Sequence, residues 1–156
     1  FFTMTTIQQS IRIQATQEAV FLFHTNPENL AKITPPYITV GLDKWSEPGL
    51  GQEVHLSLRQ WILPAQRIHI RFVEYDFPRR LTDEQVRGPF HSMRQTREFI
   101  ADGTMTIMTD TFTYSLPFGM LGALIDMLIV RHVTKAMFRY RQKKTKQLLE
   151  QNIQSR

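Results

Sequence analysis

Alternating apolar and polar residues dominate the first three quarters of the chain. An initial strand is expected over residues 6–15, followed by short helices over 16–23 and 27–32. Six further strand-like segments follow, each bounded by Gly, Pro or Asp: residues 37–42, 51–60, 65–75, 80–88, 90–101 and 103–115. Successive strands joined by short turns pair antiparallel. The pattern therefore predicts an antiparallel sheet of about seven strands.

The apolar period becomes helical after Leu116 and stays so to about Gln151. A sheet must bury one face, and this helix is the only predicted element long enough to cover it. At 100° per residue its sheet-facing stripe comprises Asp126, Ile129, Val130, Val133, Ala136, Met137, Tyr140 and Leu148. We therefore predict an α+β fold in the order β-α-α-β-β-β-β-β-β-α. One domain is expected over residues 1–156, with Phe1 to Thr3 added ahead of a natural start at Met4.

The segment from Leu116 to Val130 has the apolar character of a membrane anchor and is followed by basic residues. Its fifteen residues contain one charge, Asp126, together with two glycines and a proline. A transmembrane helix needs about 20 consecutive apolar residues. The segment therefore predicts the start of a buried helix, with no transmembrane span. The chain start also lacks the pattern of a signal peptide.

The net charge of +5 is concentrated at the C-terminal end. From Arg131 onward there are eight Lys or Arg and one acid, which gives +7, whereas residues 1–130 hold eleven against thirteen, which gives −2. This asymmetry fits nucleic acid or an anionic surface, but the solvated face of a terminal helix explains it more simply. Nucleic acid is therefore not the expected partner. The chain has no cysteine, which excludes disulfides and thiolate sites and favours a cytoplasmic location.

The dipeptide Asp102-Gly103 between two strands indicates a tight hairpin. Placing Ala101 opposite Thr104 pairs Phe99 with Thr106, Arg97 with Met108, Gln95 with Asp110, Met93 with Phe112 and His91 with Tyr114. These side chains share one face, which we expect to point inward because the opposite face is mostly polar. Polar residues on that face have two interpretations: a diagonal ion pair between Arg97 and Asp110 at an open sheet end, or polar groups in an apolar ligand pocket.

A second hairpin, with its turn near Ile62, would pair Leu56 with Ile68 and Val54 with Ile70. The same register places His55 opposite His69 on the other face of the sheet. Two imidazoles can share a metal ion, but no third ligand follows from the sequence. An exposed histidine pair is the favoured interpretation, and neither a metal nor a cofactor is predicted.

Two features of the long helix need partners. Asp126 points inward on the predicted stripe, and a buried carboxylate is costly unless it is paired, so Arg97 is its expected partner. Leu121, Leu124, Ile125 and Leu128 form a separate apolar face. Its cover could be residues 34–37, another loop, or a second copy in a homodimer formed through Leu121, Leu124 and Leu128.

Three segments carry a resemblance to a known group of proteins. They read LTDEQVRGPFHSMRQTREF (81–99), GTMTIMTDTFTYSLPFGMLG (103–122) and FRYR (138–141). With the order of elements, they resemble the SRPBCC group of START-like, helix-grip proteins, which includes polyketide cyclases. The resemblance implies a curved antiparallel sheet wrapped around the long helix, with an apolar cavity between them. Met93 stands where the group tends to have tryptophan, and Gln95 and Arg97 stand where it often has histidine, so no role of a histidine pair carries over.

Three functions are open at this stage. The favoured one is binding of an apolar small molecule, such as a lipid, an isoprenoid or an aromatic polyketide. Its expected apolar contacts are Ile70, Phe72, Met93, Phe99, Met108, Phe112, Tyr114, Ile129, Val133 and Met137. Its expected polar contacts are Gln95, Arg97, Asp110 and Asp126.

The second function is a cyclase or aromatase, which needs general acid and base groups. Asp126, Asp110, His91 and Tyr114 could supply these groups, with Arg97 stabilising an enolate. No nucleophilic triad, Gly-rich phosphate loop or metal-ligand cluster can be assembled, so an enzyme is expected less than a binder. The third function is an interaction module that uses the basic face of the long helix, or the exposed leucines, to contact an acidic protein, RNA or a membrane surface.

Overall fold

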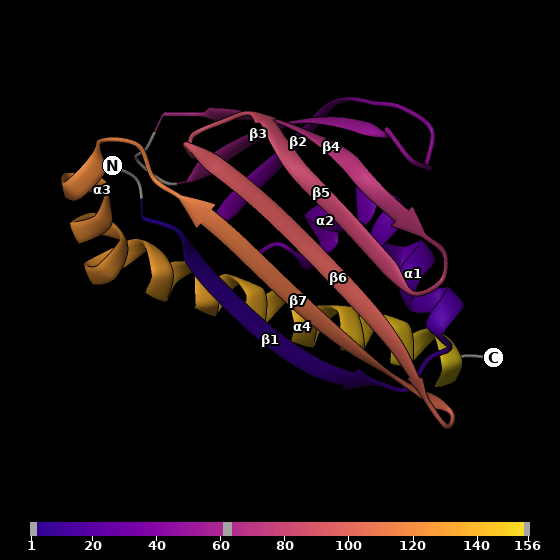
Figure 1. Cartoon of the computed structure of the whole chain (residues 1–156). Coiled ribbons are helices and arrows are strands. Elements are labelled where there is room, and N and C mark those ends of the chain that lie inside the picture. The colour runs from indigo at the N-terminus through magenta and orange to yellow at the C-terminus, as the bar shows by residue number, and fades with distance from the viewer. Residues whose placement is uncertain (1–2, 61–63, 155–156) are drawn as a thin grey trace.

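A single antiparallel sheet of seven strands organises the part of the chain that the structure describes. The computed structural model describes residues 3–60 and 64–154. The strands are β1 (Thr5–Ile13), β2 (Ile38–Trp45), β3 (Glu53–Gln60), β4 (Gln66–Asp76), β5 (Arg80–Arg87), β6 (Ser92–Asp102) and β7 (Met105–Ser115). They lie in the order β1-β7-β6-β5-β4-β3-β2, so β1 crosses over to pair with β7 (Figure 1). The predicted α+β class and element order are confirmed.

Two short helices connect β1 to β2: α1 (Gln17–Thr25) and α2 (Glu28–Ile33). The hydroxyl of Thr16 accepts a hydrogen bond of 3.2 Å from the amide of Ala19 at the start of α1. The amide of Glu28 donates to the side-chain oxygen of Asn26 at 3.1 Å before α2. The start of α1 predicted from Thr16 is confirmed. The second helix begins at Glu28, one residue later than predicted, with Pro27 in the cap position.

The C-terminal helical region comprises α3 (Gly119–Ile125), the π-helical turn η1 (Asp126–Val130) and α4 (Arg131–Gln154). Figure 1 shows α4 running along the sheet, with α3 at the end of the sheet where the chain begins. Among the described residues, no helix is both long enough and apolar enough to cross a membrane.

The π-helical turn changes which face of the helix is buried. The amide of Arg131 donates to the carbonyl of Asp126, five residues earlier, so one extra residue is inserted into the turn. The buried positions of α4 are Thr134, Phe138, Gln142, Thr145 and Leu149. The predicted stripe therefore matches the structure only in part: Asp126 is buried, Ile129 is 58 % exposed, and Val133, Met137 and Leu148 each lie one residue before the buried Thr134, Phe138 and Leu149.

The β3–β4 register agrees with the prediction, whereas the β6–β7 register does not. Leu56 lies opposite Ile68 and Val54 opposite Ile70, as expected. The predicted turn near Ile62 lies outside the described residues. In the β6–β7 hairpin Asp102 lies opposite Met105, so Gly103 and Thr104 form the turn, and Gly103 has φ +62°.

The predicted β6–β7 pairs were therefore wrong by two residues. Arg97 lies opposite Asp110, Gln95 opposite Phe112 and Met93 opposite Tyr114. A shift of two residues preserves the side-chain face, because side chains alternate with a period of two. The set of residues on the inner face is accordingly as predicted.

Most buried apolar side chains among the described residues belong to one of two clusters. The first, around Phe21, includes Phe99 and Met108 and joins α1 to the sheet. The second comprises Ile7, Phe112, Tyr114 and Phe138 and joins α4 to β1 and β7.

Candidate functional site

A cavity of about 470 Å³ lies between the inner face of the sheet, α2 and the first turns of α4. Its walls are largely apolar. Nine of the residues predicted to contact a ligand line it: Ile70, Phe72, Met93, Gln95, Arg97, Phe112, Ile129, Val133 and Met137. A mostly apolar pocket of this size with a few polar groups is the usual construction of a small-molecule site.

Five other predicted contacts do not line the cavity: Phe99, Met108, Asp110, Tyr114 and Asp126. Phe99 and Met108 belong to the buried cluster around Phe21, whose ring centroid lies 5.5 Å from that of Phe99. Tyr114 is fully buried beside Phe112. His91, predicted as a catalytic candidate, lies exposed just before β6.

Asp126 is part of a structural connection rather than of the cavity. Its carboxylate accepts hydrogen bonds from Thr5 (2.6 Å), Arg131 (2.9 Å) and the hydroxyl of Tyr114. Burial raises the pKa of Asp126, but these three hydrogen bonds outweigh burial and lower its pKa below the usual value. The expected pairing of Asp126 with Arg97 was therefore wrong, and the carboxylate instead ties η1 to β1 and β7.

Arg97 forms its ion pair directly across the strands with Asp110. The Nε atom of Arg97 lies 2.9 Å from Oδ1 of Asp110, and both side chains are buried. The contact is an ion pair rather than a well-directed hydrogen bond, because neither atom has a hydrogen-bond partner of good geometry. Gln142 donates to the other carboxylate oxygen at 2.9 Å. Arg97 lines the cavity, whereas Asp110 does not and contacts Arg97 from the neighbouring strand.

Three polar residues that the sequence analysis did not select also line the cavity: His24 of α1, Asp83 of β5 and Arg141 of α4. Atoms of all three are buried without a hydrogen-bond partner: Nε2 of His24, Oδ1 of Asp83 and Nε of Arg141. Nε2 of Gln95 is in the same condition. Buried polar atoms normally have partners, so this group of unpaired atoms around one cavity is a feature that requires explanation.

Sequence signals for two of these residues were present. Asp83 alternates with Leu81 and therefore shares its inner face, and Leu81 is buried. Arg141 is the last residue of the FRYR segment that carried the family resemblance. His24 lies at the end of a short helix, where no pattern in the sequence indicates the direction of its side chain.

Burial and the neighbouring charges shift the pKa values of the ionisable side chains around the cavity. Burial raises the pKa of Asp83 to about 6, against the opposing attraction of Arg97 and Arg141. Burial and the nearby Arg97 lower the pKa of Arg141 to about 10. Burial, together with Arg97 and Arg141, lowers the pKa of His24 well below its usual value, so its imidazole is neutral at pH 7.

These groups can therefore act on a ligand in two ways. Gln95, Arg97 and Arg141 offer donors, and Asp83 offers an acceptor, so a ligand bearing both carbonyl and hydroxyl oxygens can satisfy them. A buried carboxyl group with a pKa near 6 can also transfer a proton near neutral pH.

A cluster of histidine and acidic side chains lies elsewhere. Within residues 3–60 and 64–154, the side chains of this kind that are close enough to share a metal ion are Glu53, His55 and His69. They belong to the outer face of β3 and β4, opposite to the cavity side.

Comparison with known proteins connects this fold to one family. The family model described as polyketide cyclase / dehydrase and lipid transport matches residues 4–150. This match confirms the resemblance seen in the sequence. A search of curated proteins found no match to the sequence.

Solved structures of the same fold have very different sequences. The protein TTHA0849 of Thermus thermophilus superimposes with a TM-score of 0.77 at 17% identity, over 95% of this chain and 99% of its own. SA2116 of Staphylococcus aureus, a protein of unknown function, gives 0.75 at 12% identity, over 98% of both chains. Norcoclaurine synthase of Thalictrum flavum, solved with dopamine and hydroxybenzaldehyde, gives 0.69 at 10% identity, over 96% of this chain and 88% of its own.

Proposed function

This chain belongs to the polyketide cyclase / dehydrase and lipid transport family, and we propose that it binds an apolar small molecule with an oxygen-bearing polar end. The apolar body would lie against Ile70, Met93 and Phe112, and the polar end against Gln95 and Arg97. A lipid, an isoprenoid and an aromatic polyketide all have this chemistry.

The unpaired polar atoms in the cavity are the observation that carries this proposal. Leaving buried donors and acceptors unpaired costs free energy, which a core selected only for stability would avoid. A ligand that supplies oxygens to Nε2 of Gln95 and Nε of Arg141 would remove that cost on binding. The binding energy would then come from apolar burial along the walls and from these hydrogen bonds at the polar end.

Native mass spectrometry of the protein purified without detergent tests the proposal. We expect a non-covalent adduct of a small molecule that is lost after extraction with organic solvent. Absence of an adduct, both as purified and after incubation with a total lipid extract, would count against a binding function.

A cyclase-type enzyme is the second candidate, and one observation favours it: the raised pKa of Asp83 inside the cavity. A carboxylate in this position could remove a proton next to a substrate carbonyl, while Arg97 stabilises the resulting enolate. The earlier catalytic candidates Asp126, Asp110, His91 and Tyr114 do not line the cavity. If turnover of a polyketide-like ketone is found, Asp83→Asn should lower kcat by about 100-fold or more. Glu84→Gln, on the neighbouring residue outside the cavity, should leave kcat unchanged, and an active Asp83→Asn variant would exclude this role.

We also propose that the chain forms a homodimer through Leu121, Leu124 and Leu128. These side chains are 59 %, 48 % and 62 % exposed. Apolar surface of this kind usually marks an interaction site. The segment from Leu116 to Val130 has no charge except the buried Asp126, so its surface suits a symmetric contact with a second copy better than a charged partner.

A further inference from the structure

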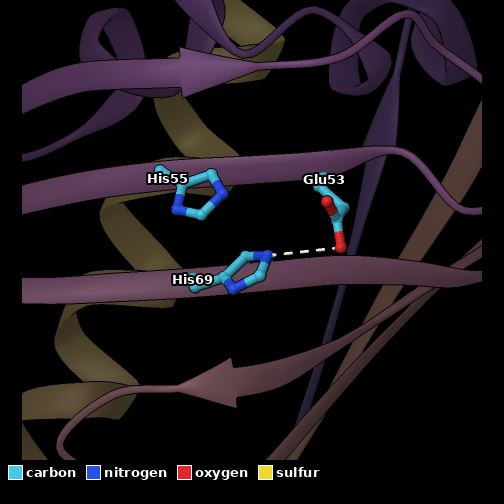
Figure 2. A group of neighbouring side chains, drawn as sticks. All are labelled: Glu53, His55 and His69. Atoms are coloured by element: carbon cyan, nitrogen blue, oxygen red, sulfur yellow. Dashed lines mark ion pairs between the residues drawn. The ribbon is translucent and has the colours of Figure 1, made fainter.

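A side-chain cluster on the outer face of the sheet is separate from the cavity. Glu53 and His55 lie on β3, and His69 lies on β4 directly opposite His55. Figure 2 shows the three side chains on the same side of these two neighbouring strands. The side chains of Val54 and Ile70, which lie next to them in sequence, line the cavity on the other side. The cluster therefore cannot contribute to the ligand site described above.

The contacts within the cluster bring three potential ligand atoms together. The two imidazole rings are stacked, with centroids 3.9 Å apart and planes 17° apart. The Nε2 atom of His69 lies 3.5 Å from Oε1 of Glu53, and it is buried without a hydrogen-bond partner. One ligand atom from each of the three residues lies within 4.8 Å of the other two.

From this geometry we propose that Glu53, His55 and His69 form a binding site for a divalent transition-metal ion, with Zn²⁺ as the ion to test. Two imidazoles and one carboxylate are a ligand set that proteins use for zinc, with a remaining position open to water. Imidazole nitrogen also suits Cu²⁺ and Ni²⁺, which the same residues would bind by the same chemistry.

Closing the site around an ion requires rotation of the imidazole rings, because the nitrogen lone pairs of two stacked rings do not converge on one point. Ligand atoms of a tetrahedral zinc ion lie about 2.0–2.2 Å from the metal and hence about 3.4 Å from one another. The three potential ligand atoms lie within 4.8 Å of one another, so rotation of the side chains would bring them to this spacing. The side chains of Glu53 and His69 are 39% and 18% exposed and can rotate without disturbing the core.

The surroundings set the expected strength of the site. Arg71 donates two hydrogen bonds to Oε1 of the Glu53 carboxylate, at 2.7 and 3.1 Å. Exposed ion pairs contribute little, so a metal ion can compete with Arg71 for it. Three basic residues, Lys44, Arg67 and Arg87, and one acid, Asp43, line the adjacent depression, and its net positive charge should limit the affinity to the micromolar range.

Titration of Zn²⁺ into protein without a polyhistidine tag, followed by calorimetry, tests the site. We expect one ion per chain. Loss of a residue that only orients a metal ligand weakens binding by roughly 10–100-fold. Loss of a direct ligand in His55→Ala or His69→Ala should weaken binding by at least as much, and Glu53→Gln should weaken it less. His132→Ala is the matched control, because this exposed histidine lies on α4, and it should bind Zn²⁺ like the unmodified chain.

Co²⁺ provides a second measurement, since its visible absorption reports the ligand geometry directly. The fold of each variant without metal is checked by circular dichroism and by its melting temperature, which should be unchanged. If His55→Ala does not fold, His55→Gln is used in its place. A Zn²⁺ concentration of about 100 µM is on the order of the dissociation constant of the weakest site expected here. No binding at this concentration would overturn the proposal. So would binding that survives in the His55→Ala/His69→Ala double variant, or a stoichiometry of one ion per two chains.

Discussion

Arg97 and Asp110 lie directly opposite each other on β6 and β7, with 2.9 Å between Nε and Oδ1, and both side chains are buried beside the cavity. Removing one member leaves a buried charge without its partner. We predict that Arg97→Met lowers the free energy of unfolding by about 3–5 kcal/mol at pH 7, measured by urea denaturation.

The double variant Arg97→Met/Asp110→Leu is the control for this pair. Replacing both charges with apolar groups removes the unpaired carboxylate, so most of the lost stability should return. A loss below about 1 kcal/mol in the single variant would show that the pair is not desolvated in solution.

Asp83 should make stability depend on pH in a direction unusual for a carboxyl group. Its folded-state pKa is raised from 3.8 to about 6, so between these values the folded protein holds a proton that the unfolded chain releases. Its contribution is therefore fully present below about pH 4 and is lost as the pH rises through about 6. The shift corresponds to about 3 kcal/mol.

The test compares Asp83→Asn with the unmodified protein by chemical denaturation at pH 4 and pH 7. The variant cannot ionise here, so its stability relative to the unmodified protein should increase by about 2–3 kcal/mol between the two pH values. Glu84→Gln, next in sequence and with a side chain that is 43% exposed, should show no such increase. Equal differences at both pH values would contradict the raised pKa.

Tyr114 should matter for stability and not for ligand binding. Its hydroxyl donates to the buried carboxylate of Asp126, and this bond joins β7 to η1. Tyr114→Phe should lower the free energy of unfolding by about 1.5–3 kcal/mol, the range for a hydrogen bond to a charged group. Tyr140→Phe, on a partly buried residue of α4, should cost less. If a folded Tyr114→Phe protein no longer bound the apolar probe N-phenyl-1-naphthylamine, Tyr114 would have to be a ligand contact.

The apolar face of α3 and η1 should control the oligomeric state. Size-exclusion chromatography with light scattering should give the mass of a dimer for the unmodified chain. Leu124→Glu/Leu128→Glu should give a monomer, because it would place four carboxylates in a symmetric interface. Lys143→Glu, at an exposed position of α4, should remain dimeric. A monomeric unmodified chain would refute the proposed dimer.

Much of this fold was predictable from local patterns. Alternation located every strand, since a sheet with one buried face imposes a period of two on its residues. The hairpin from β6 to β7 shows the limit. Asp102-Gly103 correctly indicated a turn, but both Asp-Gly and Gly-Thr can occupy its centre, and only the full pairing across eleven residues decides between them.

The candidate site was harder to predict from the sequence, because it depends on the helical phase of α4 and on contacts between residues far apart in the chain. The π-helical turn at Asp126–Val130 adds one residue, and the buried Thr134, Phe138 and Leu149 of α4 each lie one residue after a predicted position. Asp126 pairs with Arg131, and Arg97 pairs with Asp110. The polar lining draws His24, Asp83 and Arg141 from three elements far apart in the chain, and only the packing of those elements brings them to one cavity.

Titration with the fluorescent apolar probe N-phenyl-1-naphthylamine tests the central claim most directly. Ile70→Trp fills the cavity from β4, whereas Val73→Trp adds the same side chain at an exposed position of that strand. We predict saturable binding at one site per chain in the unmodified protein and in Val73→Trp, and loss of at least tenfold in affinity in Ile70→Trp, equivalent to about 1.4 kcal/mol. Equal binding by both tryptophan variants, or no saturable binding by the unmodified chain, would contradict a ligand site between the sheet and α4.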